Sequence, residues 1–492
     1  MLLSKVINND ITFVKKIEDN PNITGIDTDS RRIKHGMIFV AVEGFKEKGI
    51  NFSDKAIEAG AKVILCHKKD SKKILKKKIT ILTTKNIKLS YVKISKKFFP
   101  KQPKNISAIT GTNGKTSIAF YLNKIWQKAN LNGASIGTLG IRFNNNNIST
   151  GLTTPDAISL IKNLDFLKSK KVNYVALEAS SHGIKQERID ALKINRGIFS
   201  NLSRDHLDYH KNMEDYFKSK RRLFSEILEE NGIAIINNSC KYGKRIEKLC
   251  QKKKIKFFTY GSKDSDWSIN KIQHYPTHNL VSMLIFGKKY FFKTKLQSRL
   301  QIENLVCAMT VARSYNLPIK KLLKLIENIK EPPGRMEKIN YKKLQSNIYI
   351  DYAHTPAALK KSLKELRKNQ SDTSKLKVLF GCGGNRDQGK RKLMGIYARQ
   401  LADEIYITDD NPRYENAEKI RNQILKYCKG AIVVSDRKRA IFLAIKELKE
   451  FDTLLVAGKG HEQYQEVKGK LYFFDDKKVV LEAINAKENL CS

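Results

Sequence analysis

The sequence predicts an α/β protein of three domains: a small α/β domain over residues 1–88, a central domain with a phosphate loop and a parallel sheet over 89–335, and a doubly wound, Rossmann-like domain over 336–492. Three observations support this fold class. At 492 residues, the chain is longer than one hydrophobic core usually organises. Short apolar runs alternate with helical patterns along its length. Polar clusters follow several of the strands, as they do at the carboxyl edge of a parallel sheet.

The first domain is predicted from short apolar runs separated by turn signals, such as MIFVAVEGF (37–45) and AIEAGAKVIL (56–65). A lysine-rich run, KKDSKKILKKK (68–78), follows and contains no aromatic residue. We interpret it as a solvated helix face rather than a nucleic-acid platform. The proline-containing stretch FFPKQPK (98–104) is typical of a connector.

The central domain opens with a strand, a glycine-rich turn and a helix, in that order. NISAIT (105–110) is the strand, GTNGKT (111–116) the turn, and SIAFYLNKIWQKA (117–129) the helix. The apolar face of the predicted helix is formed by Ile118, Leu122, Ile125, Trp126 and Ala129. Backbone N–H groups of such a loop can cradle phosphates, while Lys115 neutralises charge and Thr116 ligates magnesium. The usual pattern has glycine where Ile109 stands, so the loop is a variant.

Further strands end in polar clusters in the central and last domains. VNYVAL precedes Glu178 and INRGIF precedes Ser200 in the central domain. After residue 337 the predicted strands are NIYI, KVLF, EIYIT, AIVV and DTLLVA. They are followed by segments rich in charge and glycine, including DYAHTP, GCGGNRDQGKR, DDNPR and GKGHEQYQ. Because ligands bind at the carboxyl ends of parallel strands, we expect a binding site there.

Composition limits the cellular context. A net charge of +45 is spread along the whole chain, together with abundant Lys, Ile and Asn, which indicates a coding bias rather than one nucleic-acid surface. The seven cysteines are never spaced as C-x-x-C and are expected to be reduced. Without a long apolar run or a secretory opening, we expect a cytoplasmic protein that neither inserts into a membrane nor binds nucleic acid.

Nine motifs occur together in one order, within a resemblance to a known family that runs from about Asp29 to Asp476. They are TGTNGKT, TTP (153–155), EASSHG (178–183), NLSRDHLDYH (201–210), PPGRME (332–337), DYAHTP (351–356), GCGGNRDQGKR (381–391), DNPR (410–413) and GKGHE (458–462). This set resembles the Mur ligases of peptidoglycan synthesis, and among them the tripeptide synthetases. The resemblance implies an ATP-dependent ligase with magnesium as cofactor.

The resemblance also implies the substrates. ATP would activate the D-glutamyl γ-carboxylate of UDP-N-acetylmuramoyl-L-alanyl-D-glutamate as an acyl phosphate, and the amine of meso-diaminopimelate would displace the phosphate. All partners are then small molecules, and we expect a monomer. The first domain would bind the UDP sugar, the central domain ATP, and the last domain the amino acid.

The resemblance carries over site residues motif by motif. Lys115, Glu178, His206 and Lys220 would be catalytic, with Lys220 as a carbamylated N6-carboxylysine, and Thr116, Glu178, His206 and Lys220 would hold magnesium. ATP would contact Gly111, Thr112, Asn113, Gly114, Lys115, Thr116, Ser117, Asn304 and Arg335. The UDP-muramoyl dipeptide would contact Ser30, Thr153, Thr154, Ser180, Gln186 and Arg188. His182 and His210 are equally well explained as structural histidines.

Diaminopimelate would bind in the last domain, to Arg386, Asp409, Asn411, Arg413, Gly458 and Glu462. Diaminopimelate has a distal carboxylate that lysine lacks, and Arg413 can bind it through paired hydrogen bonds. Lysine would leave the guanidinium unpaired at a cost of about 1 to 3 kcal/mol, which is roughly a tenfold to hundredfold bias.

Some residues depart from the family pattern, and three alternatives stay open. The departures are Ser239 and Cys240, then Ser298, Leu300 and Gln301, and finally Ala357, so ATP contacts are expected to differ. The alternatives are a lysine-adding homologue, a folylpolyglutamate synthase that would lack the N-terminal domain, and a basic phosphate-loop protein that binds nucleic acid.

Overall fold

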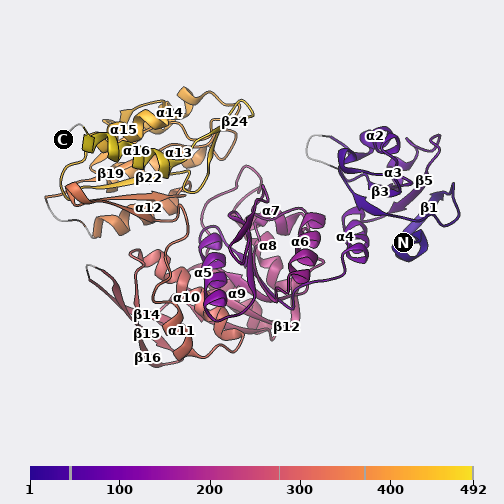
Figure 1. The fold of residues 1–492 in the computed structure, drawn as a ribbon, viewed down its shortest axis with the longest axis horizontal. Coiled ribbons are helices and arrows are strands. Elements are labelled where there is room, and N and C mark those ends of the chain that lie inside the picture. The colour runs from indigo at the N-terminus through magenta and orange to yellow at the C-terminus, as the bar shows by residue number, and fades with distance from the viewer. Residues whose placement is uncertain (44–46, 276, 369, 371–372, 490–492) are drawn as a thin grey trace.

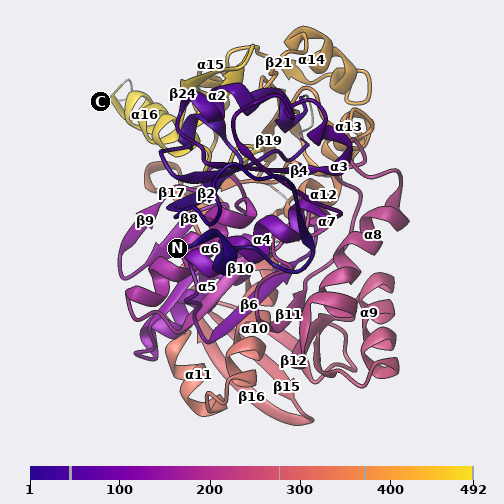
Figure 2. The same cartoon turned by 90° about the vertical axis from the view of Figure 1, so that its right-hand side faces the viewer.

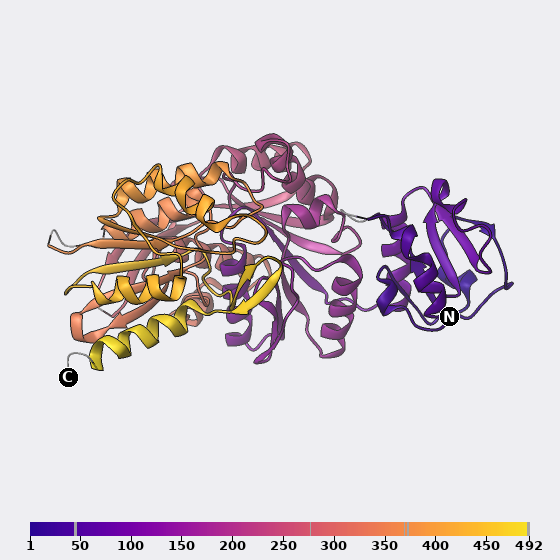
Figure 3. The same ribbon diagram turned by 90° about the horizontal axis from the view of Figure 1, so that it is seen from above.

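The structure is a computed structural model that describes residues 1–43, 47–275, 277–368, 370 and 373–489. Three α/β domains follow one another along the chain, which confirms the predicted fold class (Figure 1). Seen from above, the N-terminal domain lies at one end of the molecule (Figure 3), and Ile158 of the central domain packs into its core. Among the described residues, no helix is long and apolar enough to span a membrane. Six cysteines lie within the described residues, and all six are free, whereas Cys491 lies outside them.

The N-terminal domain is built on a five-stranded sheet of order β1-β5-β4-β3-β2. Its strands are β1 (Ile11–Lys15), β2 (Gly25–Asp27), β3 (Met37–Val40), β4 (Val63–His67) and β5 (Thr80–Thr84), all parallel except β1. Helices α1 (Leu3–Val6), α2 (Ser53–Glu58) and α4 (Ile87–Phe98) complete it. The expected domain boundary after residue 88 passes through α4, whose Tyr91 and Ile94 pack into the core of this sheet.

The prediction of a helix face over residues 68–78 was largely wrong. Only α3 (Lys68–Ser71) is helical, and turns follow it to residue 76. A longer helix would place lysines at positions i and i+4 several times over, and such like-charge pairs destabilise a helix. The lysines themselves are exposed as expected, while Ile74 is buried beneath them.

The central domain contains an eleven-stranded sheet of order β16-β15-β14-β13-β12-β11-β6-β10-β7-β8-β9. Its strands are β6 (Asn105–Thr110), β7 (Gly133–Gly137), β8 (Gly140–Phe143), β9 (Asn146–Ile148), β10 (Tyr174–Glu178), β11 (Ile194–Phe199), β12 (Leu228–Asn237), β13 (Lys256–Tyr260), β14 (Trp267–His274), β15 (Asn279–Ile285) and β16 (Lys288–Thr294). The middle strands are parallel, as predicted, and antiparallel hairpins that the sequence patterns did not reveal extend both edges. Figure 2 shows β15 and β16 at the opposite end of the molecule from the C-terminal helices.

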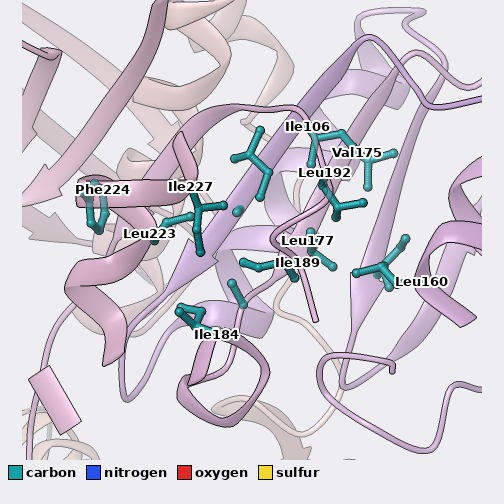
Figure 4. Packing of buried hydrophobic residues seen from close by; sticks show 14 of the residues in the cluster. Ile106, Leu160, Val175, Leu177, Ile184, Ile189, Leu192, Leu223, Phe224 and Ile227 are labelled. Atoms are coloured by element: carbon teal, nitrogen blue, oxygen red, sulfur yellow. The ribbon is translucent and has the colours of Figure 1, made fainter. Parts of the chain in front are cut away.

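Two hydrophobic cores cover the two faces of this sheet. On β10, Val175 and Leu177 face one core and Ala176 faces the other, because successive strand residues point to opposite faces. Figure 4 shows the first core, where Ile106, Val175 and Leu177 meet Leu160 and residues around Leu223. Helices α6 (Ala157–Ser169), α7 (Ser181–Lys185), α8 (Met213–Arg222) and α9 (Lys241–Lys252) contribute to this side.

The second core is formed by α5 (Lys115–Lys128), α10 (Arg299–Ser314) and α11 (Ile319–Leu325). The predicted apolar face of α5 is confirmed, since Ile118, Leu122, Ile125 and Trp126 are fully buried and Ala129 nearly so. Burying each large apolar side chain contributes about 1.5 to 3 kcal/mol. The packing therefore fixes α5 against β6 and holds the phosphate loop between them.

The C-terminal domain has a six-stranded sheet of order β17-β18-β22-β19-β20-β21. Its strands are β17 (Glu337–Tyr341), β18 (Ser346–Asp351), β19 (Leu376–Phe380), β20 (Glu404–Ile407), β21 (Ile432–Val433) and β22 (Thr453–Ala457), and all but β17 are parallel. Cores on both faces are closed by α12 (Pro356–Lys368), α13 (Gly389–Leu401), α14 (Ala417–Leu425), α15 (Arg437–Lys446) and α16 (Asp476–Asn489). A separate hairpin, β23 (Tyr464–Val467) and β24 (Lys470–Phe473), follows β22.

Candidate active site

The phosphate loop lies between β6 and α5, and two of its glycines lie so close to neighbouring residues that a side chain would not fit. Gly111 has a φ of 149°, and a Cβ there would lie 1.9 Å from the Ser200 Oγ. Gly114 has a φ of 89°, and its Cβ would lie 2.6 Å from the Asn304 Oδ1. Other residues would clash and strain the backbone. The loop therefore keeps its backbone N–H groups close to Asn304 and to the end of β11.

Two lysines point their ammonium groups at the same loop carbonyl. The Nζ of Lys115 donates to the Gly111 oxygen at 2.9 Å, and the Nζ of Lys220 donates to it at 2.8 Å. Lys220 is 1% exposed, and burial, together with the nearby Lys115 charge, holds the pKa of its amine well below the ordinary lysine value. Burial also lowers the pKa of Lys115. Lys220 thus has the environment that favours a neutral, nucleophilic amine.

Glu178 ends β10 in a buried cluster of hydrogen-bond donors. Its carboxylate accepts from the Thr116 Oγ1 at 2.9 Å, from the Thr138 N at 2.8 Å and from the Thr138 Oγ1 at 3.1 Å. Arg335 reaches across from the start of the last domain, and its Nη2 donates to the Thr116 Oγ1 at 3.1 Å. A buried carboxylate beside a threonine hydroxyl supplies the oxygen ligands that Mg²⁺ prefers.

His206 stands beside the carboxylate of Asp205, with 3.4 Å between its Nε2 and the Asp205 Oδ2. Burial lowers the pKa of His206 to about 3, although Asp205 opposes the shift. Its imidazole is therefore neutral and can offer a nitrogen lone pair to a metal. Among the described residues, no three His, Cys, Asp or Glu side chains converge as a ready-made metal site.

The two other histidines of these motifs differ from each other. Burial lowers the pKa of His182 to about 4, and its ring centroid lies 4.9 Å from that of His206, at the cavity. His210 is fully buried at its side chain, and its Nε2 lies 3.0 Å from the Ser181 Oγ. Its contacts explain His210 as a structural histidine.

One cavity of about 380 Å³ lies between the central and C-terminal domains. Lys115, His206 and Arg413 all line it, although they come from segments far apart in the sequence. The other expected site residues on its wall are Thr153, Thr154, Ser180, Arg188, Arg386, Asn411, Gly458 and Glu462. One cavity therefore brings together a lysine of the phosphate loop and residues of the C-terminal motifs.

Three of the residues expected to bind the muramoyl dipeptide or diaminopimelate are not among the described residues that line this cavity. Ser30 starts a short 3-10 helix in the N-terminal domain. Gln186 lies behind Arg188, whose Nε and Nη2 donate to its Oε1 at 3.0 and 2.6 Å. Asp409 pairs with Arg421 away from the cavity. The next residue, Asp410, lines the cavity instead.

On the C-terminal side of the cavity, a buried lysine contacts two of the expected residues. The Nζ of Lys459 donates to the Asn411 Oδ1 at 3.0 Å and to the Glu462 Oε2 at 3.3 Å. The Asn411 Nδ2 donates to the same carboxylate at 3.0 Å. Burial raises the pKa of Glu462, and the neighbouring Asp410 charge adds to the effect. Carboxylates there suit an ammonium group.

A second cavity, of about 270 Å³, lies beside the phosphate loop. It is lined by five residues expected to contact ATP, which are Asn113, Gly114, Ser117, Asn304 and Arg335. It is also lined by five residues that depart from the family pattern, which are Ser239, Cys240, Leu300, Gln301 and Ala357. Ser298 instead caps the start of α10. Five of the six departures thus line this one cavity beside the phosphate loop.

Tyr352 lines both cavities, as no other described residue does. The Arg335 guanidinium lies 4.3 Å from the centroid of its ring, and its hydroxyl donates to the Glu462 Oε1 at 3.2 Å. The sequence reasoning missed Tyr352, together with Asp205, Asp208 and Lys390 on the first cavity. All four lie inside the nine motifs, but spacing alone does not tell which side chain of a loop faces a cavity.

Comparison with known proteins identifies the family. Residues 22–98 match the catalytic domain of the Mur ligase family, 109–312 the Mur ligase middle domain, and 334–460 the Mur ligase glutamate ligase domain. The chain belongs to the Mur ligase family. As a Mur ligase, it is an ATP-dependent ligase, which confirms the enzyme class expected from the motifs.

Curated relatives match this Mur ligase over nearly its full length. Enzymes named UDP-N-acetylmuramoyl-L-alanyl-D-glutamate–2,6-diaminopimelate ligase are 36% identical over 465 residues in Mesorhizobium japonicum and 37% over 472 in Rickettsia bellii. These alignments cover 94% and 95% of this chain, and 95% and 97% of the relatives. The corresponding enzyme of Anaplasma marginale is 38% identical over 458 residues, covering 92% of this chain and 94% of its own.

Solved structures show the same architecture. A structure of UDP-N-acetylmuramoyl-L-alanyl-D-glutamate–2,6-diaminopimelate ligase aligns with a TM-score of 0.66 at 29% identity, covering 95% of each chain. A MurF ligase from Thermotoga maritima in complex with ADP aligns at 0.64 and 16% identity over 95% of this chain and 98% of its own, a likeness of fold. Folylpolyglutamate synthase from Mycobacterium tuberculosis aligns at 0.63 and 14% identity, covering 91% of its own chain but only 75% of this one.

Proposed function

We propose that this Mur ligase joins meso-diaminopimelate to the D-glutamyl γ-carboxylate of UDP-N-acetylmuramoyl-L-alanyl-D-glutamate at the expense of ATP. The observation that carries the proposal is the shared cavity, which has Lys115 at one end and the Arg413–Asn411–Glu462 group at the other. The names of relatives that are 36% to 38% identical support the choice of substrates. We expect the enzyme to act as a cytoplasmic monomer.

The phosphate-loop end supports acyl phosphate formation. Lys115 and the loop N–H groups would bind the γ-phosphate, and Arg335 would lie against it from the last domain. Thr116, Glu178 and His206 would hold magnesium, because buried oxygen donors and a neutral imidazole fit that ion. When bound, the metal would neutralise charge on the transferring phosphoryl group.

Lys220 would complete the metal site as a carbamate. A carbamate needs a neutral amine to add to carbon dioxide, and burial beside Lys115 favours the neutral form of Lys220. The neutral amine nitrogen bonds to the carbon of carbon dioxide and loses a proton, so a side chain that is positive when protonated becomes a carbamate anion. That change relieves the repulsion between two lysines that now share one carbonyl oxygen.

The acid substrate and the amine would meet across the cavity. Thr153, Thr154, Ser180 and Arg188 would bind the muramoyl dipeptide from the central domain. Arg386 and Arg413 would bind carboxylates of diaminopimelate, and Glu462, together with Asp410, an ammonium group. Closure of the cleft excludes water that would hydrolyse an acyl phosphate. The ion pair between Arg204 and Asp387, with 3.1 Å between Nε and Oδ2, joins the two domains at its rim.

The test is phosphate release by the purified protein given ATP, magnesium, the UDP-dipeptide and either meso-diaminopimelate or L-lysine. We expect release with diaminopimelate and at most a tenth of that rate with lysine. Lys115→Ala and Glu178→Ala should abolish release, whereas Arg413→Ala should chiefly raise the KM for the amino acid. Equal turnover of lysine would refute the choice of amino acid, and release without the UDP-dipeptide would refute the acid substrate.

A further inference from the structure

The hairpin β23–β24 is a separate two-stranded sheet that follows the GKGHE segment. Its strands pair from Tyr464 with Phe473 to Val467 with Lys470, and it makes no ladder with the six-stranded sheet. Figures 1 and 3 show it extending from the C-terminal domain. Its exposed outer residues include Leu471, Tyr472 and Phe473, which are 65%, 54% and 69% exposed. The inner strand β23 instead faces the segment that carries Arg413.

Strand β23 holds the backbone of Arg413 in an unusual conformation. Arg413 has a φ of 54°, in the left-handed region that costs a non-glycine residue roughly 1 kcal/mol or more. Its N donates to the Glu466 carbonyl oxygen at 3.0 Å, and its own carbonyl accepts from the Lys468 N at 2.7 Å. The two bonds fix where the Arg413 side chain leaves the backbone.

The same strand holds the guanidinium from behind. The Glu466 Oε2 lies 2.9 Å from the Arg413 Nε, and the Arg413 Nη1 donates to the Gly384 carbonyl oxygen at 3.0 Å. A Cβ on Gly383 would lie 2.8 Å from that Nη1, so the guanidinium packs closely on the glycine pair. Arg413 lines the cavity, whereas Glu466 is not among the described residues that do so. Glu466 thus pairs with the Nε side of the guanidinium group and leaves N–H groups at its far end to bind a ligand.

Neighbouring residues of β23 support the rest of the segment. The Gln465 Nε2 donates to the Asp410 carbonyl oxygen at 2.7 Å, and the Glu466 N donates to the Asn411 Oδ1 at 3.0 Å. One strand therefore contacts three groups of the proposed amino-acid site: the backbone of Asp410, the amide of Asn411 and the guanidinium of Arg413.

From this geometry we propose that Glu466 is a specificity-determining positioning residue, which keeps the Arg413 guanidinium group extended into the cavity to bind a distal carboxylate. The proposal rests on the proposed function. A fixed guanidinium binds an amino acid that ends in a carboxylate and repels one that ends only in an ammonium. A guanidinium group that could turn away from the cavity would bind the carboxylate less tightly and repel the ammonium less strongly. Glu466 thus acts through Arg413 rather than on the substrate.

The experiment compares amino-acid selectivity in Glu466→Gln and Glu466→Ala. We expect Glu466→Ala to lower kcat/KM for meso-diaminopimelate about tenfold through KM, with kcat within about twofold, and Glu466→Gln to cause a smaller loss. The ratio of kcat/KM for diaminopimelate over lysine should fall by about the same factor. Glu418→Gln, which removes an exposed carboxylate on α14, is the matched control and should leave the ratio unchanged.

A double-mutant cycle separates positioning from a merely structural role. In an Arg413→Ala background, Glu466→Ala should have no further effect on selectivity, because the group through which it acts is gone. An unchanged ratio in the single variants would overturn the proposal, and so would a full additional loss in the double variant. Equal losses of kcat for all amino acids together with a lower melting temperature would also overturn it. A wild-type enzyme without any preference for diaminopimelate would refute the proposed function, and this inference with it.

Discussion

Replacing Gly137 by alanine tests the role of Glu178 without changing a polar group. Gly137 ends strand β7, and its backbone has no positive φ, so alanine can adopt the conformation. A Cβ built there would lie 2.1 Å from the Glu178 Oε1 and 2.5 Å from both its Cδ and Cγ. All three of the nearest atoms belong to Glu178. The added methyl group therefore acts on one side chain, the carboxylate at the end of β10.

The expected effect is large on activity and moderate on stability. The nearest contact is roughly 1 Å too short, so the carboxylate must move by about that distance. A displacement of about 1 Å in a catalytic group can cost about a hundredfold in rate. Crowding a packed interior costs about 1 to 3 kcal/mol in unfolding free energy. Gly137→Ala should therefore stay folded and lose about 99% of its turnover.

The assay is phosphate release at increasing magnesium, with thermal melting measured in parallel. We expect a lower maximal rate and a higher magnesium requirement, since Glu178 is a proposed metal ligand. Gly25→Ala is the matched control, because its Cβ would meet only the flexible end of Met37, at 3.3 Å. That variant should keep nearly full activity.

Wild-type turnover and magnesium dependence in Gly137→Ala would refute the reasoning. A second variant sharpens the test. Adding Glu178→Asp shortens the acidic side chain by one methylene and makes room for the new methyl group. The double variant should recover activity relative to Gly137→Ala alone, whereas simple additive losses would show that the two residues act independently.

Three further predictions concern other buried groups. Lys220→Arg cannot form a carbamate and should lower turnover about 10- to 100-fold; a ¹³C carbamate NMR signal from labelled bicarbonate should appear in the wild type alone. Arg437 and Asp476 form an ion pair in which both side chains are fully buried. Arg437→Met leaves the Asp476 carboxylate buried without its partner, so urea unfolding should show that the free energy of unfolding of the C-terminal domain is about 3 to 5 kcal/mol lower. Burial, with a smaller effect of Arg335, lowers the pKa of His461 to about 3. Between about pH 6.5 and about pH 3, His461 therefore binds a proton in the unfolded chain but not in the folded one. The free energy of unfolding should fall as the pH drops through that range. His461→Gln should flatten that dependence in thermal melts, and an identical pH profile would contradict the assignment.

Local patterns in the sequence were sufficient for the elements that hold the site. The order of strand, glycine turn and helix over residues 105–129 predicted β6, the phosphate loop and α5, including the buried face of that helix. The polar residues after β10 and β11 were found for the same reason. Hydrophobic periodicity and turn chemistry depend on residues that are neighbours in the chain, so they can be read without the fold.

Other features depended on packing between distant segments. The sequence did not distinguish Asp409 from Asp410, since adjacent loop residues point in different directions only once the loop is held by its neighbours. Similarly, no local pattern indicated that Tyr352 would line two cavities or that Glu466 would pair with Arg413.

By itself, the sequence determined the α/β class, the strand and helix order around the phosphate loop, and the motifs that identify a Mur ligase. The tertiary structure alone decided which side chains of those motifs meet in one cavity and which neighbours hold them there. The physical reason is that hydrophobic periodicity and turn chemistry are local, whereas burial, ion pairing and pKa shifts depend on contacts made in the folded chain, many of them between residues tens to hundreds of positions apart.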